Sequence, residues 1–164
     1  MAGHQNSNAK QRARSGKLKK KKRLSCIQIN IQHSRLATDN LLKLIKENDT
    51  DIICIQEPYV IGNKIVGLPQ YYKVFALGEG RKRAAIVINN RQIDTLLINQ
   101  LSDEDAVVLE IKVDNTRIII TSLYFDINGP LDTDLQKIEA TLAHAKGAGV
   151  IIAMDNNSTI RGTT

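Results

Sequence analysis

The sequence contains only two cysteines, Cys26 and Cys54, and three histidines, at positions 4, 33 and 144. Each cysteine stands in an apolar, strand-like run with no C-x-x-C spacing and no histidine partner, which predicts buried free thiols in a reducing compartment. The histidines also lack the spacing of zinc ligands. The sequence therefore favours a protein built without a disulfide or a zinc site.

Long apolar runs are absent as well. No run approaches the length of a membrane span, and no apolar segment follows the charged N-terminus as it would in a signal peptide. With 164 residues, 42 % of them apolar, the chain can form one domain with a sizeable core. We expect an intracellular, soluble protein without membrane contact.

Acidic residues are missing from residues 1–23, which carry nine basic residues. The remaining 14 basic and 17 acidic residues give the rest of the chain a net charge of −3, although the whole chain has +6. The pattern predicts a disordered tail at 1–23. Its densest part, Lys19, Lys20, Lys21, Lys22 and Arg23, is typical of a nuclear-localisation or nucleic-acid-binding patch; a solvated tail is the alternative interpretation.

From Leu24 onward the pattern predicts a mixed α/β domain. We expect strands at 24–31, 51–57, 71–76, 84–89, 93–98, 107–113, 117–124 and 150–154. A first helix is expected after the first strand, with an inward face formed by Ala37, Leu41, Leu44 and Ile45. A second helix is expected to begin at a Thr133/Gln136 capping box. Its inward face is predicted to contain Leu135, Ile138, Leu142 and Ala145. Helices are too few for a doubly wound parallel sheet, so the prediction is a two-layer β-sandwich flanked by helices.

Four of these apolar runs end in polar residues suited to a phosphate or a metal: Asn30, Glu57, Tyr124 and the group Asp155, Asn156 and Asn157. Strand ends are where layered sheet proteins assemble sites. Mg²⁺ takes oxygen ligands and is held by one or two carboxylates together with substrate phosphate, which fits Glu57 with Asn30 beside it. Taken singly, each residue is also consistent with an ordinary turn or strand end.

The ordered set resembles the endonuclease/exonuclease/phosphatase superfamily, and in detail the apurinic-like endonuclease domain of retrotransposons that lack long terminal repeats (non-LTR). The motifs are Gln28-Ile29-Asn30, Gln56-Glu57-Pro58-Tyr59, Ser122-Leu123-Tyr124 and Asp155-Asn156-Asn157, with Arg83-Ala84-Ala85-Ile86 between the second and third. The resemblance covers residues 24–158.

This resemblance implies a sandwich that hydrolyses a DNA phosphodiester with Mg²⁺, or with Mn²⁺ in its place, and leaves a 3′-hydroxyl that primes reverse transcription in the nucleus. By motif, Glu57 and Asn30 match the metal-binding residues, Tyr124 the phosphate contact, and Asp155 and Asn157 the catalytic pair. His33 and Arg83 match recurrent positions, for which a structural role is expected.

Two departures from the family pattern bear on activity. Met154 replaces the usual glycine before Asp155, and the chain ends seven residues after Asn157, before a Ser-Asp-His motif that the family carries. The expectation is a C-terminally truncated domain, 24–164, with little or no nuclease activity. The competing interpretations are a non-catalytic nucleic-acid-binding remnant and a cellular apurinic endonuclease or small-molecule phosphoesterase. The oligomeric state and the target DNA sequence are not predicted.

Overall fold

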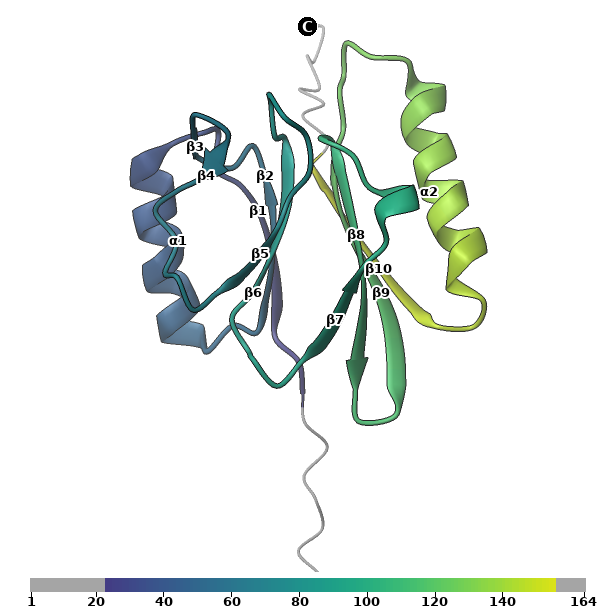
Figure 1. Cartoon of the computed structure of the whole chain (residues 1–164), viewed down its shortest axis with the longest axis horizontal. Helices are drawn as coiled ribbons and strands as arrows, with labels where there is room; N and C mark the ends of the chain where they lie inside the picture. Colours follow the sequence, from purple (N-terminus) through teal and green to yellow (C-terminus); the bar gives the residue numbers. More distant parts are fainter. Residues whose placement is uncertain (1–22, 156–164) are drawn as a thin grey trace, which may run out of the picture.

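The structure, a computed structural model, describes residues 23–155 as four layers in the order helix, sheet, sheet, helix (Figure 1). Two four-stranded sheets lie face to face; α1 covers one and α2 covers the other. The predicted two-layer sandwich with flanking helices is confirmed. Lys19, Lys20, Lys21, Lys22 and Asn157 lie outside the described residues.

The first sheet has the order β1-β2-β6-β5, with β1 parallel to β2 and the other pairs antiparallel. Its strands are Cys26–Asn30 (β1), Ile52–Gln56 (β2), Lys73–Phe75 (β5) and Ala84–Ile88 (β6). Every residue of β2 and β6 is buried because both faces of the sheet are covered. This explains their unbroken apolar sequences.

The second sheet has the order β10-β9-β8-β7, with β10 parallel to β9. Its strands are Asp94–Leu97 (β7), Ala106–Val113 (β8), Thr116–Tyr124 (β9) and Gly149–Asp155 (β10). The tight β8–β9 hairpin turns at Asp114 and Asn115. A short hairpin, Val60–Ile61 (β3) with Lys64–Ile65 (β4), and a 3-10 turn, Asn99–Leu101, were not predicted.

The main core lies between the two sheets. Alternate side chains of β2 and β6, among them Ile52, Cys54 and Ile86, pack there against Leu109 and Ile120 of the second sheet. The intervening side chains of β2 face α1 instead and form a second core with that helix. The two sheets are thus held together by their full inner faces, which fixes the relative positions of their strand ends.

Helix α1 (Arg35–Asn48) follows the sequence prediction in part. Ser34 caps its N-terminus, since its hydroxyl accepts from the Ala37 amide at 3.2 Å. Leu41 and Ile45 are buried against the first sheet, as expected, whereas Leu44 is exposed. The helix therefore packs by the stripe that its three buried residues, Thr38, Leu41 and Ile45, define.

Helix α2 (Leu131–Ala145) corrects the prediction at two points. Pro130 occupies the N-cap position and no side chain caps the helix, so the Thr133/Gln136 capping box is not formed. Ala145 is buried as predicted, whereas Leu135 and Leu142 are exposed, because Asp134 and Thr141 take the other buried positions of the helix. The buried face is therefore shifted from the predicted one and shares Ala145 with it.

Burial of the cysteines was predicted for both and holds for one. Cys54 is fully buried in the core between the sheets, whereas Cys26 is exposed at the start of the edge strand β1. An edge strand has a neighbour on one side only, which leaves its first residue open to solvent. Among residues 23–155, no helix is long and apolar enough to cross a bilayer.

Candidate functional site

Four predicted residues meet where parallel strands of both sheets end. In the first sheet Asn30 pairs with Gln56, the residue before Glu57; in the second, Asp155 pairs with Tyr124. A side-chain hydrogen bond joins the sheets, because Asn30 Nδ2 donates to Asp155 Oδ2 at 2.7 Å. Residues 125 positions apart in the sequence are therefore in direct contact.

The chain turns sharply at Glu57, whose φ of 50° lies in the left-handed region. Backbone hydrogen bonds hold this turn: the Glu57 amide donates to the Arg83 carbonyl, and the Glu57 carbonyl accepts from the His33 amide, both at 2.8 Å. A non-glycine residue in this region costs about 1–3 kcal/mol and persists where its surroundings impose it. The position of Glu57 is thus set by two neighbouring segments.

The Glu57 carboxylate remains free to bind a ligand. Its side chain is 17 % exposed, and the nearest recorded partner within residues 23–155 is His33 Nε2, at 3.8 Å from Oε1. His33 Nδ1 donates to the Pro58 carbonyl at 2.8 Å, which orients the ring. The expected structural role of His33 agrees with this contact.

Gln56 lies directly beneath the site, fully buried between the sheets. Its Nε2 donates to Ser122 Oγ at 3.0 Å and to the Ala153 carbonyl at 3.4 Å, both in the second sheet. Its Oε1 accepts from Gln28 Nε2 at 2.8 Å. Gln56 therefore fixes the second sheet against the residue that precedes Glu57.

Tyr124 lies beside a charged cluster formed by Arg83, Asp105 and Asp126. Arg83 Cζ is 4.7 Å from the centre of the Tyr124 ring, and the guanidinium forms ion pairs with both aspartates. Burial raises the pKa of Tyr124, and the charge of Glu57 raises it further. The phenol therefore stays protonated at neutral pH and can donate a hydrogen bond.

The site carries an excess of negative charge. Four carboxylates (Glu57, Asp105, Asp126 and Asp155) surround Tyr124, Asn30 and the two nearby guanidinium groups of Arg81 and Arg83. Such a surface repels a phosphate unless a cation is added. Within residues 23–155, no three His, Cys, Asp or Glu side chains form a metal-binding cluster. The one free carboxylate and the neighbouring amide fit a hard cation that uses few protein ligands.

The fold matches that of a solved retrotransposon domain. The endonuclease domain of TRAS1, a telomere-specific non-LTR retrotransposon, superposes with a TM-score of 0.71 at 27 % identity over 82 % of this chain and 59 % of that one. The chain belongs to the endonuclease/exonuclease/phosphatase superfamily. Within this superfamily it is of the non-LTR retrotransposon type.

Other comparisons agree with this membership. A 115 kDa protein of the type-1 retrotransposable element R1DM of Drosophila melanogaster is 27 % identical over 134 residues, which are 82 % of this chain and 13 % of that protein. D. rerio TDP2, solved with a single-strand DNA product, shares the fold at a TM-score of 0.58 and 17 % identity over 80 % of this chain and 60 % of that one. No family model matches the sequence. The chain thus spans about three fifths of the TRAS1 domain and a small part of the R1DM protein.

The strand-end site also contains residues to which the sequence assigned no functional role. Arg83, Asp105 and Asp126 join Tyr124, and Gln56 joins the sheets. The sequence contained a feature that pointed to two of these residues: Arg83 stands in a motif that matches the family, and Gln56 is a polar residue inside an apolar run. Only the contacts gave them a role.

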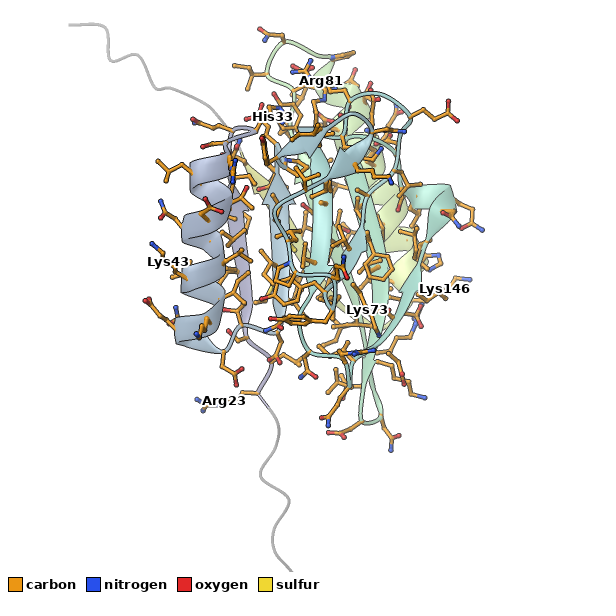
Figure 2. The ribbon with its side chains drawn as sticks, turned by 60° about the vertical axis from the view of Figure 1, so that its left-hand side comes forward. Arg23, His33, Lys43, Lys73, Arg81 and Lys146 are labelled. Atoms are coloured by element: carbon orange, nitrogen blue, oxygen red, sulfur yellow. The ribbon has the colours of Figure 1, made fainter. Side chains whose placement is uncertain are left out.

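The predicted basic patch is represented in the structure by Arg23 alone. Arg23 lies at one end of the molecule, whereas His33 and Arg81 lie at the other (Figure 2). Arg23 is therefore distant from the strand-end site. Any DNA contact it makes is separate from the contacts at Glu57.

Proposed function

We propose that this domain hydrolyses a phosphodiester of DNA with Mg²⁺, or with Mn²⁺ in its place, as part of a non-LTR retrotransposon protein. The observation that carries the proposal is the meeting of Asn30, Glu57 and Asp155 at one edge of both sheets. The similarity to the TRAS1 endonuclease domain supports it. We extend the proposal to the biological step: a nick made in the nucleus supplies a 3′-hydroxyl that primes reverse transcription.

The residues divide the chemistry among them. Glu57, with the Asn30 side-chain oxygen, would hold the metal ion, which when bound supplies positive charge against the phosphate. Asn30 Nδ2 fixes the Asp155 carboxylate, which accepts a proton from the attacking water. The Tyr124 hydroxyl donates a hydrogen bond to a phosphate oxygen. Asn157, outside the described residues, is assigned by motif to orient Asp155.

The test is a plasmid nicking assay with the purified chain. Supercoiled DNA is expected to become nicked circles with Mg²⁺, slowly, and not with EDTA. Asp155→Asn is expected to lower the rate by at least about 100-fold, because removing a proton-transfer group costs 10²–10⁴. Asp94→Asn, an exposed carboxylate on β7, is the control and should nick at the parent rate.

Other outcomes would replace the proposal. DNA binding without any metal-dependent nick would identify a non-catalytic nucleic-acid-binding remnant. Strong preference for abasic-site DNA over intact duplex would favour an apurinic endonuclease. Hydrolysis of small phosphate esters alone would point to a phosphoesterase.

Arg81 provides a separate test of DNA binding. Of three consecutive basic residues, Lys82 binds Asn63 Oδ1 and the Gly78 carbonyl, and Arg83 binds two aspartates. Arg81 is exposed, has no recorded ion pair with a residue in 23–155, and lies close enough to Tyr124 to act on its pKa. We predict that Arg81→Gln weakens DNA binding. It should also reduce the slope of log Kd against the logarithm of the salt concentration by about one.

The matched control is Lys43→Gln, an exposed lysine on the outer side of α1, away from the site (Figure 2). Fluorescence anisotropy of labelled duplex DNA at several salt concentrations measures both variants. Equal slopes for Arg81→Gln and Lys43→Gln would show that Arg81 makes no phosphate contact.

A further inference from the structure

Each of the three guanidinium nitrogens of Arg83 donates to a neighbouring carboxylate. Its Nε donates to Asp105 Oδ1 at 2.5 Å and its Nη2 to Asp105 Oδ2 at 2.6 Å, a two-pronged ion pair. Its Nη1 donates to Asp126 Oδ2 at 3.1 Å. The side chain is only 14 % exposed. Since two carboxylates oppose one guanidinium, Arg83 has no surplus positive charge for a phosphate.

The same ion pair holds Tyr124 in two ways. The guanidinium lies over the tyrosine ring, with Cζ 4.7 Å from its centre. The Asp105 carbonyl accepts from the Tyr124 amide at 2.8 Å. Both the ring and the backbone of Tyr124 are therefore anchored to the Arg83–Asp105 pair.

The backbone of Arg83 reaches the other half of the site. Its carbonyl accepts from the Glu57 amide at 2.8 Å, at the left-handed turn that presents the Glu57 carboxylate. Its own amide donates to the Glu104 carbonyl at 2.8 Å, next to Asp105. One residue thus connects the turn at Glu57 to the ring of Tyr124.

We propose that Arg83 is a positioning residue, which acts through Tyr124 by fixing the phenol ring against the turn at Glu57. The inference rests on the proposed function, in which Tyr124 donates to the phosphate. A planar guanidinium is required because an ammonium cannot make the two-pronged contact and lie flat on the ring. Asp105 and Asp126 complete the arrangement by orienting the guanidinium.

The first experiment measures Tyr124 directly and needs no activity. Tyrosine is replaced by 3-fluorotyrosine, and the ¹⁹F signal of residue 124 is assigned with Tyr124→Phe and followed against pH. Arg83→Met is expected to move this titration to higher pH, because it removes a cation that stabilises the phenolate and leaves two carboxylates unpaired. An unchanged titration would overturn the inference.

Arg117→Met is the matched control for folding and for loss of an ion-paired arginine. Arg117 lies near the opposite end of β9 from Tyr124, pairs with Glu110 at 2.8 Å and donates to the Ala145 carbonyl. Arg117→Met should leave the pH titration of the Tyr124 ¹⁹F signal unchanged. An equal shift in both variants would indicate a general loosening of β9 and would count against a specific role for Arg83.

The second experiment is a double-mutant cycle on the nicking rate. Arg83→Lys is expected to lower kcat by about 10- to 100-fold with a smaller change in KM, as misplacement of a phosphate contact would. In the Tyr124→Phe background, Arg83→Lys should add little, because the group it positions is gone. Fully additive effects would overturn the inference. If the parent chain does not nick DNA, the proposed function fails. The ¹⁹F titration then still tests whether Arg83 acts on the Tyr124 phenol.

Discussion

Glu57→Gln is expected to weaken binding of Mn²⁺ to this domain by about 100-fold or more. The substitution replaces the Glu57 carboxylate, which has no Lys or Arg partner within residues 23–155, by a neutral amide of the same shape. Changes in residues that merely orient a metal ligand already cost about 10- to 100-fold in affinity, so loss of the ligand itself should cost at least as much. Electron paramagnetic resonance of free Mn²⁺ during titration of the protein measures the affinity.

Glu139→Gln is the control for this measurement, since it makes the same chemical change at an exposed position on α2. Its Mn²⁺ affinity should equal that of the parent. Parent-like affinity in Glu57→Gln would place the metal elsewhere and remove the basis of the proposed site.

Gln56→Leu is expected to destabilise the fold by about 1–3 kcal/mol, the cost of leaving buried polar partners unsatisfied. The substitution keeps most of the side-chain volume but removes the hydrogen bonds to Ser122, the Ala153 carbonyl and Gln28. Ser122 retains one bond, to the Ile55 carbonyl at 3.1 Å, which limits the loss. Urea unfolding followed by circular dichroism gives the change in free energy.

The surface control is Gln136→Leu on the exposed side of α2, where a change within about 0.5 kcal/mol is expected. Gln56→Leu should also lower Mn²⁺ affinity in the folded state, because Gln56 sets the backbone directly before Glu57. Parent-like stability for Gln56→Leu would mean that the apolar packing between the sheets alone determines their relative position.

Local sequence patterns were sufficient to predict the eight strands of the two four-stranded sheets and the order of the polar residues at their ends. The runs ending at Asn30, Glu57, Tyr124 and Asp155 are apolar, and a buried strand requires such a run whatever its neighbours are. These features depend on the periodicity of a single segment.

The errors lie where a choice between faces or neighbours was needed. The leucines of α2 repeat at helical spacing, yet Leu135 and Leu142 are exposed while Asp134 and Thr141 are buried. Cys26 lies in an apolar run, yet it is exposed because β1 is an edge strand. Periodicity identifies a stripe, whereas the position of the element in the fold decides whether that stripe is covered.

The sequence by itself determined the sandwich and the four residue types that its strands present. The tertiary structure alone decided that Asn30 contacts Asp155 across the two sheets, and that Arg83 lies between the turn at Glu57 and the ring of Tyr124. The physical reason is distance along the sequence. Strand formation follows from the propensity and burial of one segment, whereas these contacts join distant segments that only the packing of the two sheets brings together.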